Sequence, residues 1–188
     1  MPDTQVVANV LPVFEGGKIA DAFHGTTSSC AAAIMERRGF KPGMEGMYGE
    51  GVYFFEGDYW AASWWARKRQ REQHSGSAVV IRAEVSLGKV LYANLMVPEV
   101  QRLKPEMERV LGQPISEDKA WQLLTAALLR NGLISSIRVT READKRWLPP
   151  DSEYRFEIVI CACDPSKITI VQQLKPEDLN KTIAVAVL

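Results

Sequence analysis

The most informative stretch of the sequence is Gly49-Glu50-Gly51-Val52-Tyr53-Phe54. Its valine and aromatic residues favour a β-strand, and its glycines let another backbone or a ligand approach closely. The ring of Tyr53 offers a flat face on which a planar group can stack. The stretch predicts a strand that borders a binding site, although a β-hairpin with aromatic core residues would have the same composition.

A second motif, His24-Gly25-Thr26, precedes this strand. It reads as the end of a strand, and residues 26–29 supply several N-caps for an alanine-rich helix over residues 30–38 that Gly39 would end. Histidine offers two ring nitrogens for hydrogen bonds, glycine lets a ligand reach the main chain, and threonine adds a hydroxyl. The trio suits a planar carboxamide beside a ribose. Taken alone, it fits a structural turn equally well.

The remaining elements follow from periodicity and capping. Asp58 is expected to cap the helix over residues 59–73. Gly88 is expected to close the strand over residues 78–87, and residues 90–92 could resume it. The expected strands are 51–55, 78–87, 133–139, 154–163 and 168–171, the expected helices 30–38, 59–73, 98–112 and 116–131, and the expected loops 41–50 and 141–151. Many short strands without regular strand–helix alternation predict an α+β fold with a mainly antiparallel sheet and a helical insert over residues 98–132.

Length and composition are those of one globular domain. The 188 residues, 46% hydrophobic and 24% charged, fit a single domain over residues 1–188. Residues 1–20 read as an extended N-terminal arm with a turn at Glu15-Gly16-Gly17. No repeat or linker divides the chain.

Charge and cysteine content indicate which binding partners and which cellular compartment to expect. With 23 basic and 23 acidic residues, the molecule has no overall bias toward nucleic acid or anionic membranes. The basic run Arg67-Lys68-Arg69-Gln70-Arg71 fits a solvated helix end as well as a phosphate contact. Cys30, Cys161 and Cys163 have no metal-ligand spacing and favour a reducing compartment. Without an export signal or an apolar run of about 18 residues, the sequence predicts a cytoplasmic protein with no membrane span, and delivery as an effector by a non-classical route stays open.

The order of these motifs resembles the catalytic domain of the poly(ADP-ribose) polymerase branch of the ADP-ribosyltransferases. The resemblance runs from about Phe23 to Tyr92, through both motifs, the aromatic helix and Glu84-Val85-Ser86-Leu87-Gly88, and it returns over residues 154–174. Residues 98–150 match nothing in that family. The resemblance implies an ADP-ribosyltransferase fold, in which two packed, mainly antiparallel sheets enclose a cleft for NAD.

The resemblance also implies roles for individual residues. His24 would hydrogen-bond a ribose hydroxyl of NAD, and the backbone of Gly25 would hold the nicotinamide amide with help from Thr26. Tyr53 and Trp64 would enclose the nicotinamide ring. The NAD-binding residues expected in this way are His24, Gly25, Thr26, Gly51, Tyr53 and Trp64, and no metal is implied.

A carboxylate completes the expected triad of His24, Tyr53 and Glu157. It is needed because positive charge develops on the ribose as the bond to nicotinamide breaks. The spacing from Glu157 to Asp164 is two residues longer than in the family. Either the strand carries a bulge or an extension, or Glu153, on the same strand face, is the catalytic residue. The usual spacing would fall on Val159, which has no carboxylate.

A second departure from the family is Ala61, where many members have a serine that donates to the nicotinamide carboxamide. Ser63 lies near in sequence but faces elsewhere on a helix. Alanine therefore implies a looser hold on nicotinamide. Trp60 and Trp65 read as core residues. Trp147 lies in the region that commonly contacts the acceptor in this superfamily, and packing of its ring onto its own domain is the alternative.

These features predict an NAD-dependent ADP-ribosyltransferase that uses NAD as substrate and transfers one ADP-ribose to a macromolecular acceptor, a protein in first place. Alternatives with the same fold are an NAD hydrolase toxin, an RNA 2′-phosphotransferase and a nucleic-acid-directed transferase. The neutral charge weighs against the last two. Ala61 and the uncertain glutamate leave open an inactive module that binds NAD, ADP-ribose or a protein.

Overall fold

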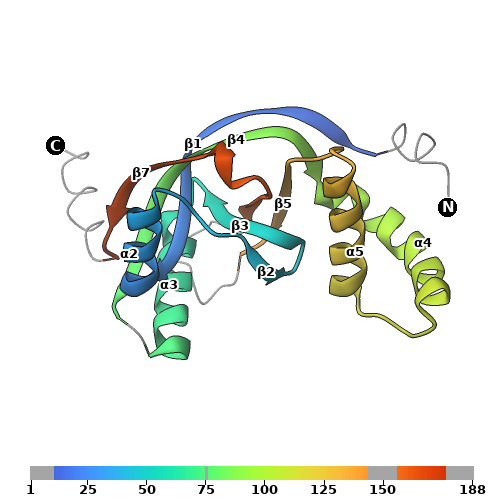
Figure 1. The fold of residues 1–188 in the computed structure, drawn as a ribbon, viewed down its shortest axis with the longest axis horizontal. Helices are drawn as coiled ribbons and strands as arrows, with labels where there is room; N and C mark the ends of the chain where they lie inside the picture. The colour runs from blue at the N-terminus through green and yellow to red at the C-terminus, as the bar shows by residue number, and fades with distance from the viewer. Residues whose placement is uncertain (1–10, 75, 144–155, 177–188) are drawn as a thin grey trace.

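A computed structural model describes residues 11–74, 76–143 and 156–176, and within them it forms a mixed α+β fold (Figure 1). The strands are β1 Val13–Thr27, β2 Gly43–Gly46, β3 Gly49–Glu56, β4 Ala78–Tyr92, β5 Ser136–Glu142, β6 Phe156–Ala162 and β7 Ile168–Leu174. The helices are α2 Ser28–Arg37, α3 Tyr59–Gln73, α4 Ala93–Leu111 and α5 Glu117–Arg130, with a short 3₁₀ helix at Pro165–Lys167. The expectation of an α+β fold is confirmed.

The strands pair in a closed path. Hydrogen bonds join them in the order β1-β3-β6-β5-β4, and β4 also pairs with β1, while β7 lies beside β4 and β2 beside β3. All of these pairs are antiparallel except β4–β5. The mainly antiparallel character is therefore confirmed. The expected pair of separate sheets is not what the hydrogen bonds form among the described strands, because β1 and β4 are long enough to pair with neighbours on both sides.

The strands β1 and β4 are longer than the sequence predicts, so two predicted boundaries are wrong. The turn expected at residues 15–17 and the strand end expected at Gly88 both lie inside strands, where Gly16 and Gly88 are Cα partners. A Cβ on Gly16 would come within 2.3 Å of Val90 Cγ2, and Gly88 has a positive φ of 59°. The glycines permit close pairing and local distortion within the ladder. The N-terminal arm is thus a strand from Val13 onward (Figure 1).

Capping sets most of the helix boundaries. The side chain of Asp58 accepts a hydrogen bond from the Ala61 amide at 2.9 Å, and α3 spans the residues expected from the sequence. Helix α2 ends one residue early because Arg38, with φ 54°, takes the left-handed position expected at Gly39. The loop expected over residues 41–50 contains β2 and the turn of a hairpin with β3.

The helical insert connects two parallel strands. Strands β4 and β5 run parallel, and such strands require a crossover connection, which α4 and α5 provide. The insert begins at Ala93, before the expected residue 98. In the first turn of α4, the Asn94 side chain accepts a hydrogen bond from the Thr140 amide at 2.7 Å and donates one to the Thr140 carbonyl at 2.6 Å, which ties the helix to β5. No helix among the described residues is long and apolar enough to cross a membrane.

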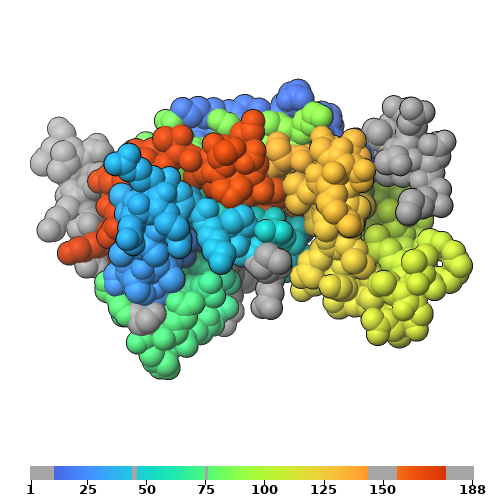
Figure 2. Space-filling model, viewed as in Figure 1, coloured from blue at the N-terminus to red at the C-terminus, as the bar shows by residue number. Residues whose placement is uncertain are grey.

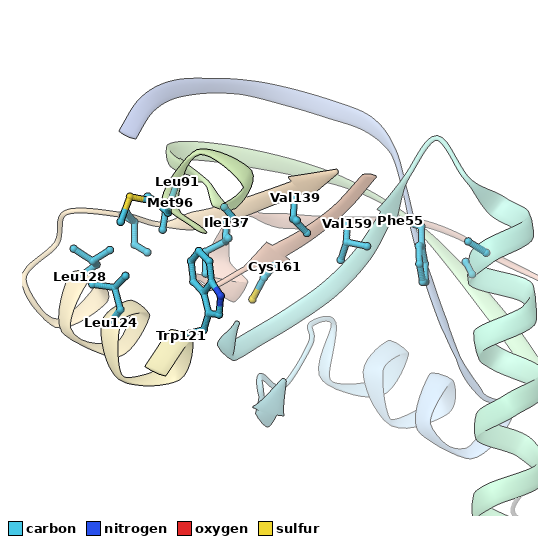
Figure 3. Packing of buried hydrophobic residues seen from close by; sticks show 14 of the residues in the cluster. Phe55, Leu91, Met96, Trp121, Leu124, Leu128, Ile137, Val139, Val159 and Cys161 are labelled. Carbon is cyan, nitrogen blue, oxygen red and sulfur yellow. The ribbon is translucent and has the colours of Figure 1, made fainter. Parts of the chain in front are cut away.

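The buried side chains form two clusters on opposite faces of β3 and β6. Figure 3 shows the first, which runs from Phe55 near α3, past Val159 and Cys161, to Trp121 on α5. The second contains Phe54 and Ile160 and is covered by α2. In the space-filling view, α2 and α3 lie at one end of the molecule and α4 and α5 at the other, with the hairpin strands between them (Figure 2). Successive residues along β3 and β6 therefore point alternately to the first and to the second cluster.

Candidate functional site

Tyr53 is fixed inside the β2–β3 hairpin. Its hydroxyl donates to the Gly49 carbonyl at 2.8 Å and accepts from the Tyr48 amide at 3.1 Å. Its ring lies against Gly46, where a Cβ would come within 2.0 Å of the hydroxyl oxygen. Burial raises the pKa of the phenol, so it stays protonated near neutral pH. The hairpin holds the ring in one position before any ligand arrives.

His24 is tied to the backbone of Tyr53. The β1–β3 ladder contains the pairs Ala22–Glu56 and Phe23–Phe55, and next to it the His24 Nδ1 donates to the Tyr53 carbonyl at 2.8 Å. Burial lowers the pKa of the imidazole, and the positive charge of Arg69 adds to this effect. A neutral ring that donates from Nδ1 has Nε2 as an acceptor. That acceptor is of the kind that a ribose hydroxyl needs.

The side chain of His24 lies on the opposite face from the ring of Tyr53. The His24 ring packs on Phe40 and Phe54, with centroids 5.2 and 5.7 Å away. Both phenylalanines belong to the second cluster, whereas the ring of Tyr53 packs against the first. The hydrogen bond between the two site residues is therefore made through the backbone of β3.

The packing of α3 on β1 is enough to explain why residue 25 is a glycine. A Cβ at this position would lie 2.0 Å from the Ala62 carbonyl oxygen and 2.8 Å from the Ala66 amide nitrogen. The missing side chain lets α3 pack directly on β1, so space for a ligand is not needed to explain this glycine. Thr26 is also buried, at 7% exposure. Gly51 has a similar packing role, because a Cβ there would lie 2.4 Å from Cys161 Sγ.

Glu157 is a buried carboxylate in the middle strand of the site. The residue is 1% exposed, and its side chain accepts a hydrogen bond from Arg141 within an ion pair. The two residues are Cα partners on β6 and β5. A solvated strand edge, the ordinary position for a glutamate, is therefore ruled out for Glu157.

The described part of β6 contains no bulge. Its pairing with β5 proceeds without a register shift from residue 156 to residue 162, and its pairing with β3 does so from residue 159 to residue 162. Of the explanations for the long spacing to Asp164, an extended strand is compatible with this register. Glu153 lies outside the described residues, as does Trp147.

Tyr53, Glu157 and Arg141 lie on one face of β3, β6 and β5. The cross-strand pairs Tyr53–Cys161 and Phe55–Val159 lead along this face to Glu157. Residues at alternate positions share a face, so Glu157 lies on the same side as Tyr53, two positions beyond Val159. The structure thus places two members of the expected triad on one face, and its third member, His24, behind β3.

Helix α3 contributes an aromatic and basic surface. Trp65 packs against the first cluster, as expected for a core residue. The rings of Trp64 and Trp65 are 6.4 Å apart, and Lys68 Nζ lies 5.8 and 4.6 Å from their respective centroids. These contacts do not include the Tyr53 ring, so the expected sandwich around nicotinamide stays a prediction.

The two positions considered for a carboxamide donor on α3 are buried. Ala61 is 2% exposed and has no side-chain donor, and its amide is taken by Asp58. Ser63 is 1% exposed, and its hydroxyl has no hydrogen-bond partner among the described residues. It lies two positions along the helix, about 200° around the axis from Ala61. Ser63 is therefore no substitute for the family serine.

Arg141 contacts Glu157, and the sequence alone does not predict this contact. It was assigned to the charged loop 141–151, but it lies within β5, which ends at Glu142. The sequence does contain a pattern that favours a longer strand, since Ile137, Val139 and Arg141 occupy every second position and so share one face of it. No group of three or more histidine, cysteine or acidic residues suited to a metal ion occurs among residues 11–74, 76–143 and 156–176.

Comparisons with known proteins leave the family open. The chain matches no family model. It is 24% identical over 192 residues to the uncharacterised protein MJ0359 of Methanocaldococcus jannaschii, an alignment covering 86% of this chain and 88% of that one. It is similar to a solved chain of the M. tuberculosis MbcT–MbcA toxin–antitoxin complex with a TM-score of 0.48 and 12% identity, over 97% of this chain and 98% of that one. A likeness this weak assigns neither fold family nor activity.

Proposed function

We propose that this protein is an NAD-dependent ADP-ribosyltransferase that breaks the nicotinamide–ribose bond of NAD. The observation that carries the proposal is the buried carboxylate of Glu157 on the same face of the sheet as Tyr53. A buried carboxylate is costly unless it is compensated, and such groups concentrate at functional sites. The sequence resemblance to the poly(ADP-ribose) polymerase branch supports the same assignment.

The proposed chemistry assigns Glu157 the central step. As the bond to nicotinamide breaks, positive charge develops on the ribose, and a fixed carboxylate stabilises that charge. Glu157 would also accept a hydrogen bond from the ribose 2′-hydroxyl. Nicotinamide leaves with the electron pair of the broken bond, and an acceptor oxygen or nitrogen forms the new bond to the ribose carbon and loses its proton.

The remaining residues would hold NAD in place. Tyr53 would stack on nicotinamide with the ring that the hairpin fixes. His24, neutral at physiological pH, would accept from a ribose hydroxyl through Nε2. In this proposal Gly25 contributes its backbone, Thr26 and Gly51 lie beside the bound NAD, and Trp64 lies on the far side of nicotinamide.

The acceptor that we propose is a protein, and the product a single ADP-ribose on it. The balance of 23 basic and 23 acidic residues gives no general attraction to nucleic acid, which supports a protein over an RNA acceptor. A toxin that transfers ADP-ribose to water, and so hydrolyses NAD, would use the same residues.

A second candidate function is a module that binds NAD or ADP-ribose without catalysis. The observation that favours it is the position of the His24 side chain against Phe40 and Phe54, behind the strand that carries Tyr53. The ion pair between Glu157 and Arg141 points the same way, because an ion-paired carboxylate is less available to a substrate.

The experiment incubates the purified protein with NAD labelled on the adenylate part, with and without cell lysate, and measures nicotinamide release and labelled macromolecules. Label on protein supports the transferase, release without lysate and without label supports hydrolysis, and label on RNA would overturn the protein acceptor. NAD binding without release in either condition would establish the inactive module and contradict the proposed enzyme.

A further inference from the structure

Arg141 and Glu157 form a cross-strand ion pair within an apolar surface. They are Cα partners on β5 and β6, and the neighbouring pair on the same face is Val139 and Val159, each 5% exposed. The carboxylate end of the pair is fully buried, whereas the arginine side chain is 35% exposed. The ion pair therefore has one buried end, at Glu157, and one end that solvent reaches, at Arg141.

Arg141 places a positive charge against the buried carboxylate of Glu157. Burial alone favours the neutral acid, and a positive charge within hydrogen-bond distance reverses that preference. The other titratable side chains on this face of β3 and β6 are Tyr53 and Cys161, and burial raises the pKa of the Tyr53 phenol. On α3, Lys68 lies over Trp64 and Trp65 and is paired with Glu72.

We infer that Arg141 is a positioning residue for the proposed reaction: it keeps the carboxylate of Glu157 ionised and pointing to one place on the sheet face. The inference rests on the proposed function, since it concerns the same site. A guanidinium suits this task because its planar fork fixes direction as well as charge. Lysine would supply the charge without the fixed geometry.

The same strand offers a matched control. Arg138 on β5 also pairs with a glutamate, Glu56 on β3, which lies on the far side of β6, with an Nε–Oε2 distance of 2.7 Å. Both partners are partly exposed, and Arg138 is an odd number of positions from Arg141, so it lies on the other face of β5. Removing Arg138 breaks a similar ion pair without touching Glu157.

The test compares the full-length wild type with Arg141→Met, Arg141→Lys and Arg138→Met. Nicotinamide release from NAD is measured across pH, and the Glu157 carboxyl is titrated by ¹³C NMR, with Glu157→Gln identifying its signal. We expect Arg141→Met to lower the rate at neutral pH by roughly 100-fold. We expect the acid limb of its rate profile and the carboxyl titration to move to higher pH. Arg141→Lys should restore the titration but only part of the rate, and Arg138→Met should match the wild type.

Two results would overturn the inference. One is an Arg141→Met protein whose Glu157 titration is unchanged, and this readout holds whether or not the wild type cleaves NAD. The other is an Arg141→Lys protein with the full wild-type rate, which also decides the matter if Arg141→Met does not fold. A wild type that releases no nicotinamide contradicts the proposed function, while the carboxyl titration still tests the hold of Arg141 on Glu157.

Discussion

The imidazole Nδ1 of His24 donates a hydrogen bond to the backbone carbonyl of Tyr53 at 2.8 Å, next to the last paired residues of β1 and β3. A side chain thus extends the contact between the two strands beyond their backbone ladder. The bond also selects the tautomer that has Nε2 as an acceptor. Structure and proposed function therefore depend on the same neutral histidine.

The first prediction concerns the pH dependence of stability. Because burial lowers the pKa of His24 in the folded state, the unfolded chain binds the proton more readily. Stability from this residue is present above the unfolded pKa of about 6.5 and is lost as the pH falls toward the folded pKa, with a slope of at most about 1.4 kcal/mol per pH unit. Urea unfolding between pH 7.5 and 5 should show this loss in the wild type.

The variant His24→Gln should have a smaller loss of stability over the same pH range, because its amide does not titrate. The control is His74→Asn, at the C-cap of α3, where φ is 49° and asparagine tolerates the left-handed conformation. Equal pH slopes for His24→Gln and the wild type would show that His24 is not the residue responsible.

The second prediction separates the two parts of Tyr53. Tyr53→Phe removes the hydroxyl that bonds Gly49 and Tyr48, which should cost about 1–2 kcal/mol of stability and leave the ring in place. Tyr53→Ala also removes the proposed stacking surface. Calorimetric titration with NAD should show a small loss of affinity for the first variant and a loss of at least about tenfold for the second. Wild-type NAD affinity in a folded Tyr53→Ala protein would contradict the stacking role.

The third prediction tests why residue 25 is a glycine. Gly25→Ala places a methyl group 2.0 Å from the Ala62 carbonyl oxygen, so α3 must shift from β1. We expect the free energy of unfolding to fall by at least about 1 kcal/mol. The matched control is Gly17→Ala on the same strand, where a Cβ would meet no atom within 4 Å and stability should hardly change. Similar unfolding midpoints for both variants would refute the close packing.

The fourth prediction couples Gly51 to Cys161. The Cβ of Gly51→Ala would lie 2.4 Å from the Cys161 sulfur, and we expect destabilisation by about 1–3 kcal/mol. Cys161→Ala removes that sulfur, so the two changes together should cost less than the sum of the separate costs. A double-mutant cycle on chemical unfolding measures this coupling. Additive costs would mean that the two residues do not press on each other.

Local signals in the sequence predicted the helices and most strands well. Asp58 identified the start of α3, because a capping side chain acts within three residues. The boundaries at Gly16 and Gly88 were wrong because each glycine is paired across the β1–β4 ladder, which joins residues far apart in the chain. Glycine in a strand and glycine in a turn look alike until the partner strand is known.

The positions of the candidate site residues could be predicted from the sequence only in part, and the reason is the same. The motifs at His24 and Tyr53 are continuous in sequence, and the structure joins them directly. The side of the sheet on which each side chain lies depends on strand register, and this placed His24 on the face opposite to Tyr53. Arg141 was missed because its partner, Glu157, is on another strand, and only the β5–β6 register brings them together.

The most direct test of the central claim is nicotinamide release from NAD by the wild type, Glu157→Gln and Glu153→Gln at neutral pH. Both variants replace a glutamate by its amide in the same segment of the chain, and circular dichroism confirms that each is folded. We predict that Glu157→Gln loses at least about 100-fold in rate, as expected for removal of a group that stabilises transition-state charge, while Glu153→Gln retains the wild-type rate. Full activity of Glu157→Gln with loss in Glu153→Gln would contradict the account.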